Sequence, residues 1–130
     1  MANVLAVVGS RSYATNSLAS RKAEEIIEAE IEKGYDVLTS GGASGPDSWG
    51  KVVADKLGID TKIFYPNWNK YGRSAGFKRN KDIIAYSSMV LIFWDGESRG
   101  TSHDIDLCKE MGKPYKVYTW VQNEWRLRKA

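Results

Sequence analysis

The sequence has one cysteine and one histidine, and these scarcities exclude several kinds of chemistry. Cys108 has no second cysteine to pair with, so an internal disulfide is excluded, and alone it cannot build a cysteine-based zinc site. No Cys-His pair, Ser-His-Asp order or cluster of metal-ligating side chains stands out along the chain. We therefore expect neither a metal nor a cofactor, and we interpret His103 as a structural or solvated residue.

Long hydrophobic runs and a strong net charge are also missing. The apolar run near the start lasts five residues, from Val4 to Val8, which is too short for a signal peptide or a membrane span. The formal charge is +3, which permits an anionic ligand, whereas a nucleic-acid-binding protein usually has a denser basic surface. We expect a cytoplasmic protein with a small-molecule ligand and no membrane partner, and we favour a nucleic-acid partner less.

Short apolar segments alternate with amphipathic ones along the 130 residues. The apolar segments are typical of strands buried on both faces, and the amphipathic segments of helices. Strands are predicted over residues 3–9, 35–40, 61–66, 89–94 and 115–120, and helices over 17–33, 45–58, 81–88 and 101–112. The alternation predicts one α/β domain over residues 1–120, a Rossmann-like doubly wound parallel sheet of about five strands with helices on both faces. Residues 121–130 are predicted as a basic C-terminal tail.

Loops rich in small residues follow the first, second and fourth predicted strands, at residues 9–12, 41–47 and 95–101. The carboxyl ends of parallel strands meet at one edge of the sheet, which is where such sheets bind ligands. The sequence therefore predicts a ligand cleft at this edge. The loop residues predicted to contact the ligand are Gly9, Ser10, Arg11, Gly41, Gly42, Ala43, Gly45, Asp47, Gly96, Arg99, Gly100 and Thr101.

The residue types in these loops favour an anionic ligand. Arg11 matches the geometry of a phosphate, and the glycine-rich loops present backbone N–H groups where helices begin. Neither a Walker A loop nor G-x-G-x-x-G is present, which argues against nucleoside triphosphate hydrolysis and ordinary NAD binding. Thr101 is expected to cap its helix. Asp47 would repel a phosphate laid directly on it, so it either caps a helix or contacts sugar hydroxyls.

A long loop, "NWNKYGRSAGFKRN" at residues 67–80, mixes aromatic and basic side chains. Arg73 and Arg79 are predicted to face the cleft, because each lies near a glycine in a loop that returns to it. We interpret Trp68 and Tyr71 as residues that pack the loop onto the sheet edge. The same composition is also compatible with stacking a base or binding single-stranded nucleic acid.

Four stretches carry a family resemblance: "GSR" at 9–11, "SGGASGPDSWG" at 40–50, "FYPNWNKYGRSAGFKRNKDII" at 64–84 and "GESRGTSHDI" at 96–105. In this order they resemble the YspA-like branch of the SLOG superfamily, whose relatives include the Lonely guy phosphoribohydrolases and DNA-processing protein A. The resemblance covers residues 3 to about 118. It implies a Rossmann-like domain that binds nucleotides or nucleotide-derived ligands, in a homo-oligomer of two or more copies.

The phosphoribohydrolase relatives release a free base from a nucleoside 5′-monophosphate, with an arginine in an E-R-K stretch and a glutamate in PGGxGTxxE. By this resemblance Arg79 takes the place of the arginine and Asp104 that of the glutamate, which implies catalytic roles for both. The sequence departs from the pattern in two ways. Gly-Glu-Ser at 96–98 replaces Pro-Gly-Gly, and the acid is one methylene shorter, which changes its reach in a step governed by geometry.

Three functional hypotheses follow. The first is a nucleotide-binding cleft that hydrolyses the N-glycosidic bond of a nucleoside 5′-monophosphate. The second is a non-catalytic sensor or sequestering protein for a nucleotide signal such as an ADP-ribose derivative. The third is single-stranded DNA binding, which the basic aromatic loop and the "WRLRKA" end of the chain favour.

Overall fold

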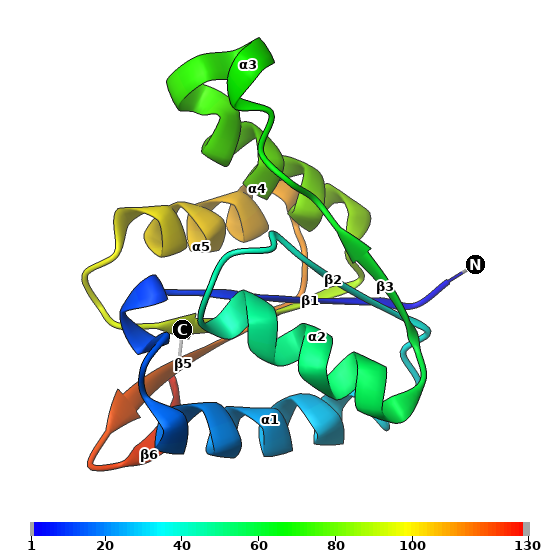
Figure 1. The fold of residues 1–130 in the computed structure, drawn as a ribbon, viewed down its shortest axis with the longest axis vertical. Helices are drawn as coiled ribbons and strands as arrows, with labels where there is room; N and C mark the ends of the chain where they lie inside the picture. Colours follow the sequence, from blue (N-terminus) through cyan, green and yellow to red (C-terminus); the bar gives the residue numbers. More distant parts are fainter. Residues whose placement is uncertain (1, 129–130) are drawn as a thin grey trace.

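The computed structural model describes residues 2–128, and its centre is a six-stranded sheet in the order β3-β2-β1-β4-β5-β6 (Figure 1). The strands are β1 (Val4–Gly9), β2 (Val37–Ser40), β3 (Asp60–Ile63), β4 (Met89–Trp94), β5 (Tyr115–Val121) and β6 (Glu124–Arg128). The first five are parallel, and β6 pairs antiparallel with β5. The predicted Rossmann-like α/β fold is confirmed.

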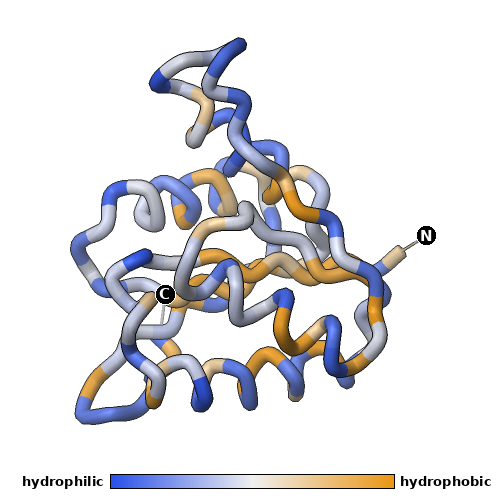
Figure 2. Tube along the Cα trace, viewed as in Figure 1, coloured by the Kyte–Doolittle hydropathy of each residue, from blue (hydrophilic) through white to orange (hydrophobic). Residues whose placement is uncertain are grey.

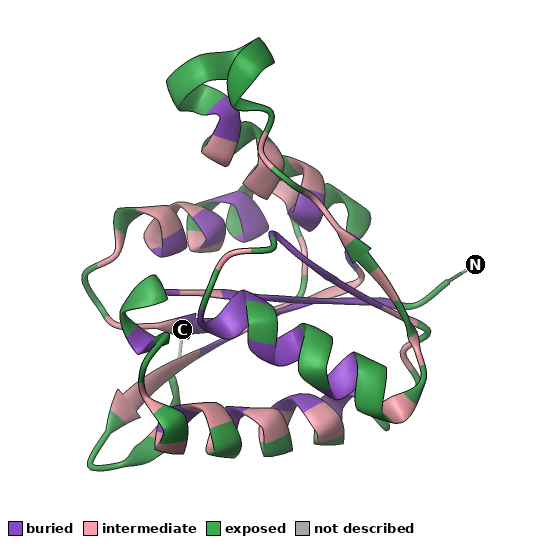
Figure 3. Ribbon diagram, viewed as in Figure 1, coloured by how far each residue is buried: buried purple, intermediate pink, exposed green. Residues whose placement is uncertain are grey.

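Helices cover both faces of the sheet (Figure 1). The two on one face are α1 (Ser17–Ile31) and α2 (Pro46–Leu57); the two on the other are α4 (Ala75–Tyr86) and α5 (Arg99–Met111). A short helix, α3 (Trp68–Tyr71), lies apart from both layers and has no buried residue, as its exposed colouring in Figure 3 shows. None of the helices in residues 2–128 combines the length and the apolar character that crossing a membrane requires.

The central strands are buried because their side chains alternate between two hydrophobic cores. Leu5 and Val7 of β1 face the core beneath α1 and α2, whereas Ala6 and Val8 face the core beneath α4 and α5. Figure 2 shows hydrophobic stretches in these strands and also along the helices that pack against them. Gly50 brings α2 close to the sheet, since a Cβ there would lie 3.0 Å from Cβ of Val7.

Residues 121–128 belong to the sheet and its last turn, so the prediction of a basic C-terminal tail over them is wrong. Residues 124–128 form β6, which a turn at Gln122 and Asn123 joins to β5; both turn residues have positive φ, as in a two-residue type I′ hairpin. Trp125 explains why the segment folds back. Its ring packs on Tyr13, Trp49 and Phe93, and its Nε1 donates to the carbonyl of Ala19 (2.9 Å). Lys129 and Ala130 lie outside the described residues.

Two further boundaries differ from the predictions. Helix α4 begins at Ala75 instead of residue 81, so Arg79 belongs to a helix and not to a loop. Helix α5 begins at Arg99 with Ser98 as its N-cap, so Thr101 lies inside the first turn and does not cap the helix. The strand order reverses at β1, whose neighbours β2 and β4 follow it in opposite directions across the sheet. Ligand sites in doubly wound sheets lie outside the carboxyl ends of the strands at such a point.

Candidate functional site

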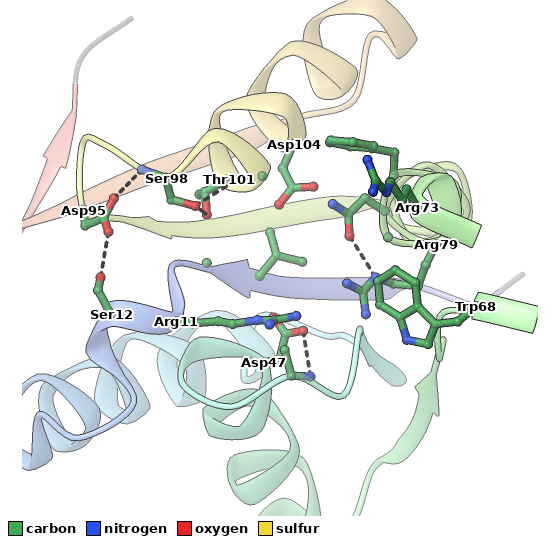
Figure 4. A pocket seen from close by; sticks show the side chains of 17 residues that line it. Arg11, Ser12, Asp47, Trp68, Arg73, Arg79, Asp95, Ser98, Thr101 and Asp104 are labelled. Atoms are coloured by element: carbon green, nitrogen blue, oxygen red, sulfur yellow. Dashed lines mark hydrogen bonds between the residues drawn. The ribbon is translucent and has the colours of Figure 1, made fainter. Parts of the chain in front are cut away.

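A cavity of about 440 Å³ lies at the carboxyl ends of β1 and β4 (Figure 4). Its walls come from the turn after β1, the start of α2, the 68–80 segment and the start of α5. These are the loops in which the sequence analysis places the ligand contacts. The predicted site residues that line the cavity are Gly9, Arg11, Ala43, Asp47, Arg73, Arg79, Gly100, Thr101 and Asp104.

Asp47 does not cap a helix. The N-cap of α2 is Gly45, which has no side chain to offer, and the Asp47 carboxylate instead accepts hydrogen bonds from the N–H groups of Gly41 (3.0 Å) and Ala43 (3.2 Å). The capping interpretation is therefore wrong. Two N–H groups of the glycine-rich loop are already bonded to this carboxylate, so they are not free for a phosphate.

Arg79 is held in place by the same loop. Its Nη1 donates to the carbonyl of Gly41 (2.6 Å) and its Nε donates to Oδ1 of Asn80 (2.9 Å). A Cβ at position 41 would lie 2.6 Å from Nη1 of Arg79, so the glycine permits the close approach of the guanidinium. Gly41 thus positions a site residue and does not itself line the cavity. Gly42 faces the ring of Tyr65, and a Cβ there would lie 2.7 Å from it.

A chain of hydroxyls joins β1 to the start of α5. Ser10 is buried; its Oγ accepts from the N–H of Asp95 (3.1 Å) and lies 3.2 Å from Oγ1 of Thr101. The Thr101 hydroxyl in turn donates to Oγ of Ser98 (3.2 Å). Ser10 therefore supports the cavity wall without lining it, and Gly96 and Arg99 are exposed outside the lining.

Sequence reasoning missed Ser12, Asp95 and Ser98, which also line the cavity. Asp95 accepts from Ser12 Oγ (2.7 Å) and from the N–H groups of Ser98 (2.8 Å) and Glu97 (2.9 Å). Partial burial alone would raise the pKa of Asp95, but these hydrogen bonds outweigh it and the pKa lies below its ordinary value. A carboxylate directly after the buried strand β4 is the signal that could have identified this residue.

Two further carboxyl groups are almost fully buried in the cavity wall: Asp47 is 7% exposed and Asp104 is 5% exposed. Burial raises the pKa of Asp47 to about 6, although hydrogen bonds and the charges of Arg79 and Arg11 oppose the shift. Burial and the nearby charge of Asp47 raise the pKa of Asp104 well above its ordinary value, against Arg79. Oδ1 of Asp104 is buried without a hydrogen-bond partner among residues 2–128.

The aromatic residues of the 68–80 segment are exposed. Trp68 is 56% exposed and Tyr71 is 37% exposed, so the interpretation that they pack the loop onto the sheet edge is wrong. Trp68 and Arg79 both line the cavity (Figure 4). His103 does not line the cavity, and its ring meets the edge of Phe77 with 4.9 Å between ring centroids.

The cavity therefore combines groups suited to an anion with groups suited to acid–base chemistry. Guanidinium groups of Arg11, Arg73 and Arg79 line it, together with the start of α5, where the first N–H groups have no intrahelical acceptor. Within residues 2–128 no group of three or more His, Cys, Asp or Glu side chains is placed to hold a metal ion. Asp47 and Asp104 are the buried ionisable groups of the lining.

Comparison with known proteins agrees with the fold. No family model matches the chain, and no curated protein matches its sequence. Among solved structures the chain is similar to DNA processing protein A (DprA) from Streptococcus pneumoniae, with a TM-score of 0.70 and 18% sequence identity. The match covers 93% of this chain and 50% of DprA, so the chain spans about half the length of that protein. At this identity the likeness shows that the two share a Rossmann-like fold.

Proposed function

We propose that the cavity binds a nucleoside phosphate and that the protein hydrolyses its N-glycosidic bond. The observation that carries the proposal is the juxtaposition, in one cavity, of a helix start and three arginines with two buried carboxyl groups. A nucleoside phosphate needs cations and N–H groups at one end, and polar groups beside its sugar. Cleavage of its glycosidic bond needs a carboxyl group at the reacting centre.

The phosphate end of the proposed site is the start of α5. The dipole of a helix and those first-turn N–H groups that its cap does not occupy attract an anion at this position; in α5 the cap occupies the N–H group of Thr101, which donates to Ser98 Oγ (3.4 Å). Ser98 and Thr101 add hydroxyl groups, and Arg11 lines the same cavity from the turn after β1 (Figure 4). The glycine-rich loop before α2 is the poorer phosphate site, because its N–H groups bond to Asp47.

The base end of the proposed site is the 68–80 segment. Trp68 and Phe77 both line the cavity with exposed aromatic rings, which can stack on any base. With the phosphate at α5 and the base on this segment, the sugar lies between Asp47 and Asp104. The resemblance to phosphoribohydrolases supports this orientation, because it matches Arg79 and Asp104 to their catalytic arginine and glutamate.

The test is to incubate the purified protein with nucleoside 5′-monophosphates and ADP-ribose and to search for free base by chromatography. Base release supports the proposal, whereas ligand that binds and is recovered intact supports the sequestering hypothesis and contradicts hydrolysis. Arg11→Ala should weaken nucleotide binding by about 10-fold or more, the equivalent of one charge-assisted hydrogen bond. Arg21→Ala, an exposed arginine of α1, is the matched control and should leave binding unchanged.

A second candidate function, single-stranded DNA binding, is favoured by one surface. Residues 64–86 contain five Lys or Arg against one acidic residue, Asp82. The same segment exposes five aromatic rings: Tyr65, Trp68, Tyr71, Phe77 and Tyr86. Stacking platforms among cations are typical of single-strand binders. An oligonucleotide mobility shift that weakens steeply with salt, and that Trp68→Ala reduces, would support this function.

The resemblance also implies more than one copy of the chain in solution, and we propose a dimer. Light scattering on the full chain measures its mass directly. A mass equal to that of one chain, 14.6 kDa, contradicts the dimer.

A further inference from the structure

The two buried carboxyl groups of the cavity have opposite hydrogen-bond environments. Asp47 accepts from two backbone N–H groups, whereas Oδ1 of Asp104 is buried without a partner in the described chain. N–H donors stabilise a carboxylate anion, and burial without donors favours the neutral acid. At neutral pH this asymmetry makes Asp47 the anionic carboxyl group of the pair and Asp104 the protonated one.

The two groups also come from opposite sides of the cavity. Asp104 projects from α5, above β1 and β4 in Figure 4, and Asp47 projects from the start of α2 below them. Both line the cavity, so a ligand held there can contact both. Where the surroundings keep one carboxyl group protonated and its neighbour ionised, the protonated group can act as a general acid and the ionised group as a general base. Inverting glycoside cleavage needs such groups on opposite faces of the sugar.

We infer that Asp104 is the general acid and Asp47 the general base, and that the substrate is an N-glycoside whose leaving base must accept a proton. The inference rests on the proposed function and specifies its substrate class. That class contains nucleotides of neutral purine or pyrimidine bases. N-ribosyl pyridinium compounds do not depend on the acid, because their base leaves as a neutral molecule without protonation.

The proposed step balances with water as its one co-reactant. The carboxyl proton of Asp104 passes to a ring nitrogen of the base, and the bond between that base and sugar C1′ breaks, with its electron pair going to the base. The water oxygen bonds to C1′, and the Asp47 carboxylate takes the water proton. The products are a neutral free base and a sugar phosphate. Proton exchange with solvent then returns Asp104 to the acid and Asp47 to the carboxylate.

The charged surroundings of the two groups are consistent with these roles. Asp47 and Arg79 are the charged groups that act on Asp104, and no ion pair within 4.0 Å joins Arg79 to it among the described residues. Arg79 and Arg11 act on Asp47. Both arginines favour ionisation of Asp47, which also accepts hydrogen bonds. Asp104 has Arg79 alone to oppose its burial and the charge of Asp47, and it keeps its proton.

The experiment compares two substrates and two variants of the full chain. Adenosine 5′-monophosphate needs a proton on its leaving base, and nicotinamide mononucleotide does not. Asp104→Asn should lower adenine release by about 100-fold or more, with adenosine monophosphate affinity within about threefold of the wild type. Nicotinamide release, where present, should change far less. Asp104→Glu should recover part of the adenine release, since it restores an acid at this position.

The outcomes separate the inference from the proposed function. If Asp104→Asn lowers both releases equally, or neither, the acid role is wrong and the hydrolase stands. If nucleotides bind and no base is released, the acid–base pair and hydrolysis are wrong and binding stands. If no nucleotide binds, both proposals fail.

Thermal unfolding tests the protonation states of Asp47 and Asp104 without any measurement of enzyme activity. Asp104→Asn should unfold near neutral pH at the same or a higher temperature than the wild type, because the amide resembles the neutral acid. Asp47→Asn should unfold at a lower temperature, because its hydrogen bonds to the loop are weakened. An equal decrease in both variants would show that Asp104 is held as an anion, which overturns the inference.

Discussion

Replacing Gly41 by alanine tests the contact network that positions Arg79. A Cβ at this position would lie 2.6 Å from Nη1 of Arg79 and 2.8 Å from Oδ2 of Asp47. Gly41 does not have a positive φ, so the backbone itself accepts alanine and the conflict is purely steric. The methyl group must therefore displace the guanidinium, the carboxylate or both.

The cost can be estimated from the bonds that the displacement breaks. Arg79 donates to the carbonyl of Gly41, and Asp47 accepts from its N–H group. Hydrogen bonds to charged groups contribute about 1.5–3 kcal/mol each, and one or both are lost here. We expect Gly41→Ala to lower the free energy of unfolding by about 2–4 kcal/mol. Adenosine monophosphate affinity should fall by about 10-fold or more, since Arg79 leaves its place in the cavity.

Urea denaturation measures the first effect and isothermal titration with adenosine monophosphate the second. Gly76→Ala is the matched control: it adds the same methyl group to the same cavity, but its nearest neighbour is Cη2 of Trp68 at 3.8 Å, an ordinary contact. Because Gly76 lies in α4, the control should be more stable than the wild type by up to about 1 kcal/mol. If Gly41→Ala is as stable as the wild type and binds nucleotide equally well, the network does not hold Arg79 and the reasoning is refuted.

Three further predictions each concern one residue. The pKa of Asp47 is raised from 3.8 to about 6, so the folded chain keeps a proton that the unfolded chain releases in this range. Its contribution to stability must fall as the pH rises from about 4 to about 6, by up to about 3 kcal/mol. The unfolding free energy of the wild type minus that of Asp47→Asn should decrease over this window, and an increase contradicts the assignment. Trp125→Ala should cost about 3–5 kcal/mol in urea denaturation, because the ring contacts three buried aromatic residues and β6 loses its anchor. Ser98→Ala should cost about 1 kcal/mol, since it removes the N-cap of α5, whereas loss of nucleotide affinity without loss of stability would show that its hydroxyl serves the ligand alone.

The architecture was accessible from the sequence because hydrophobic periodicity is a local property. Segments such as "VLAVV" and "MVLIF" are apolar on both faces, which is the pattern of a buried parallel strand, and they form β1 and β4 at the centre of the sheet. The edge strand β6 could not be predicted from hydrophobic periodicity. Its residues are mostly polar and exposed, and it is held by Trp125, whose partners are distant in the sequence.

The position of the cleft could also be predicted from the sequence, but the side chains that face it could not. Topology places every strand-to-helix loop of a parallel sheet at one edge. The loops after β1, β2 and β4 therefore meet there, independently of which side chains they carry. Which side chain faces the cavity depends on contacts between loops. Gly41 donates to Asp47, six residues along the chain, and accepts from Arg79 of α4, a partner that no spacing along the chain indicates.

The sequence by itself determined the order of strands and helices, the doubly wound sheet and the edge at which its loops meet, because these follow from local periodicity and chain connectivity. The tertiary structure alone decided the surroundings of the two carboxyl groups, from which we infer their protonation. Asp47 and Asp104 are the same residue type, the first in the first turn of α2 and the second in the second turn of α5. One is reached by backbone N–H groups and the other is buried without a donor, and this difference in surroundings separates an anion from an acid.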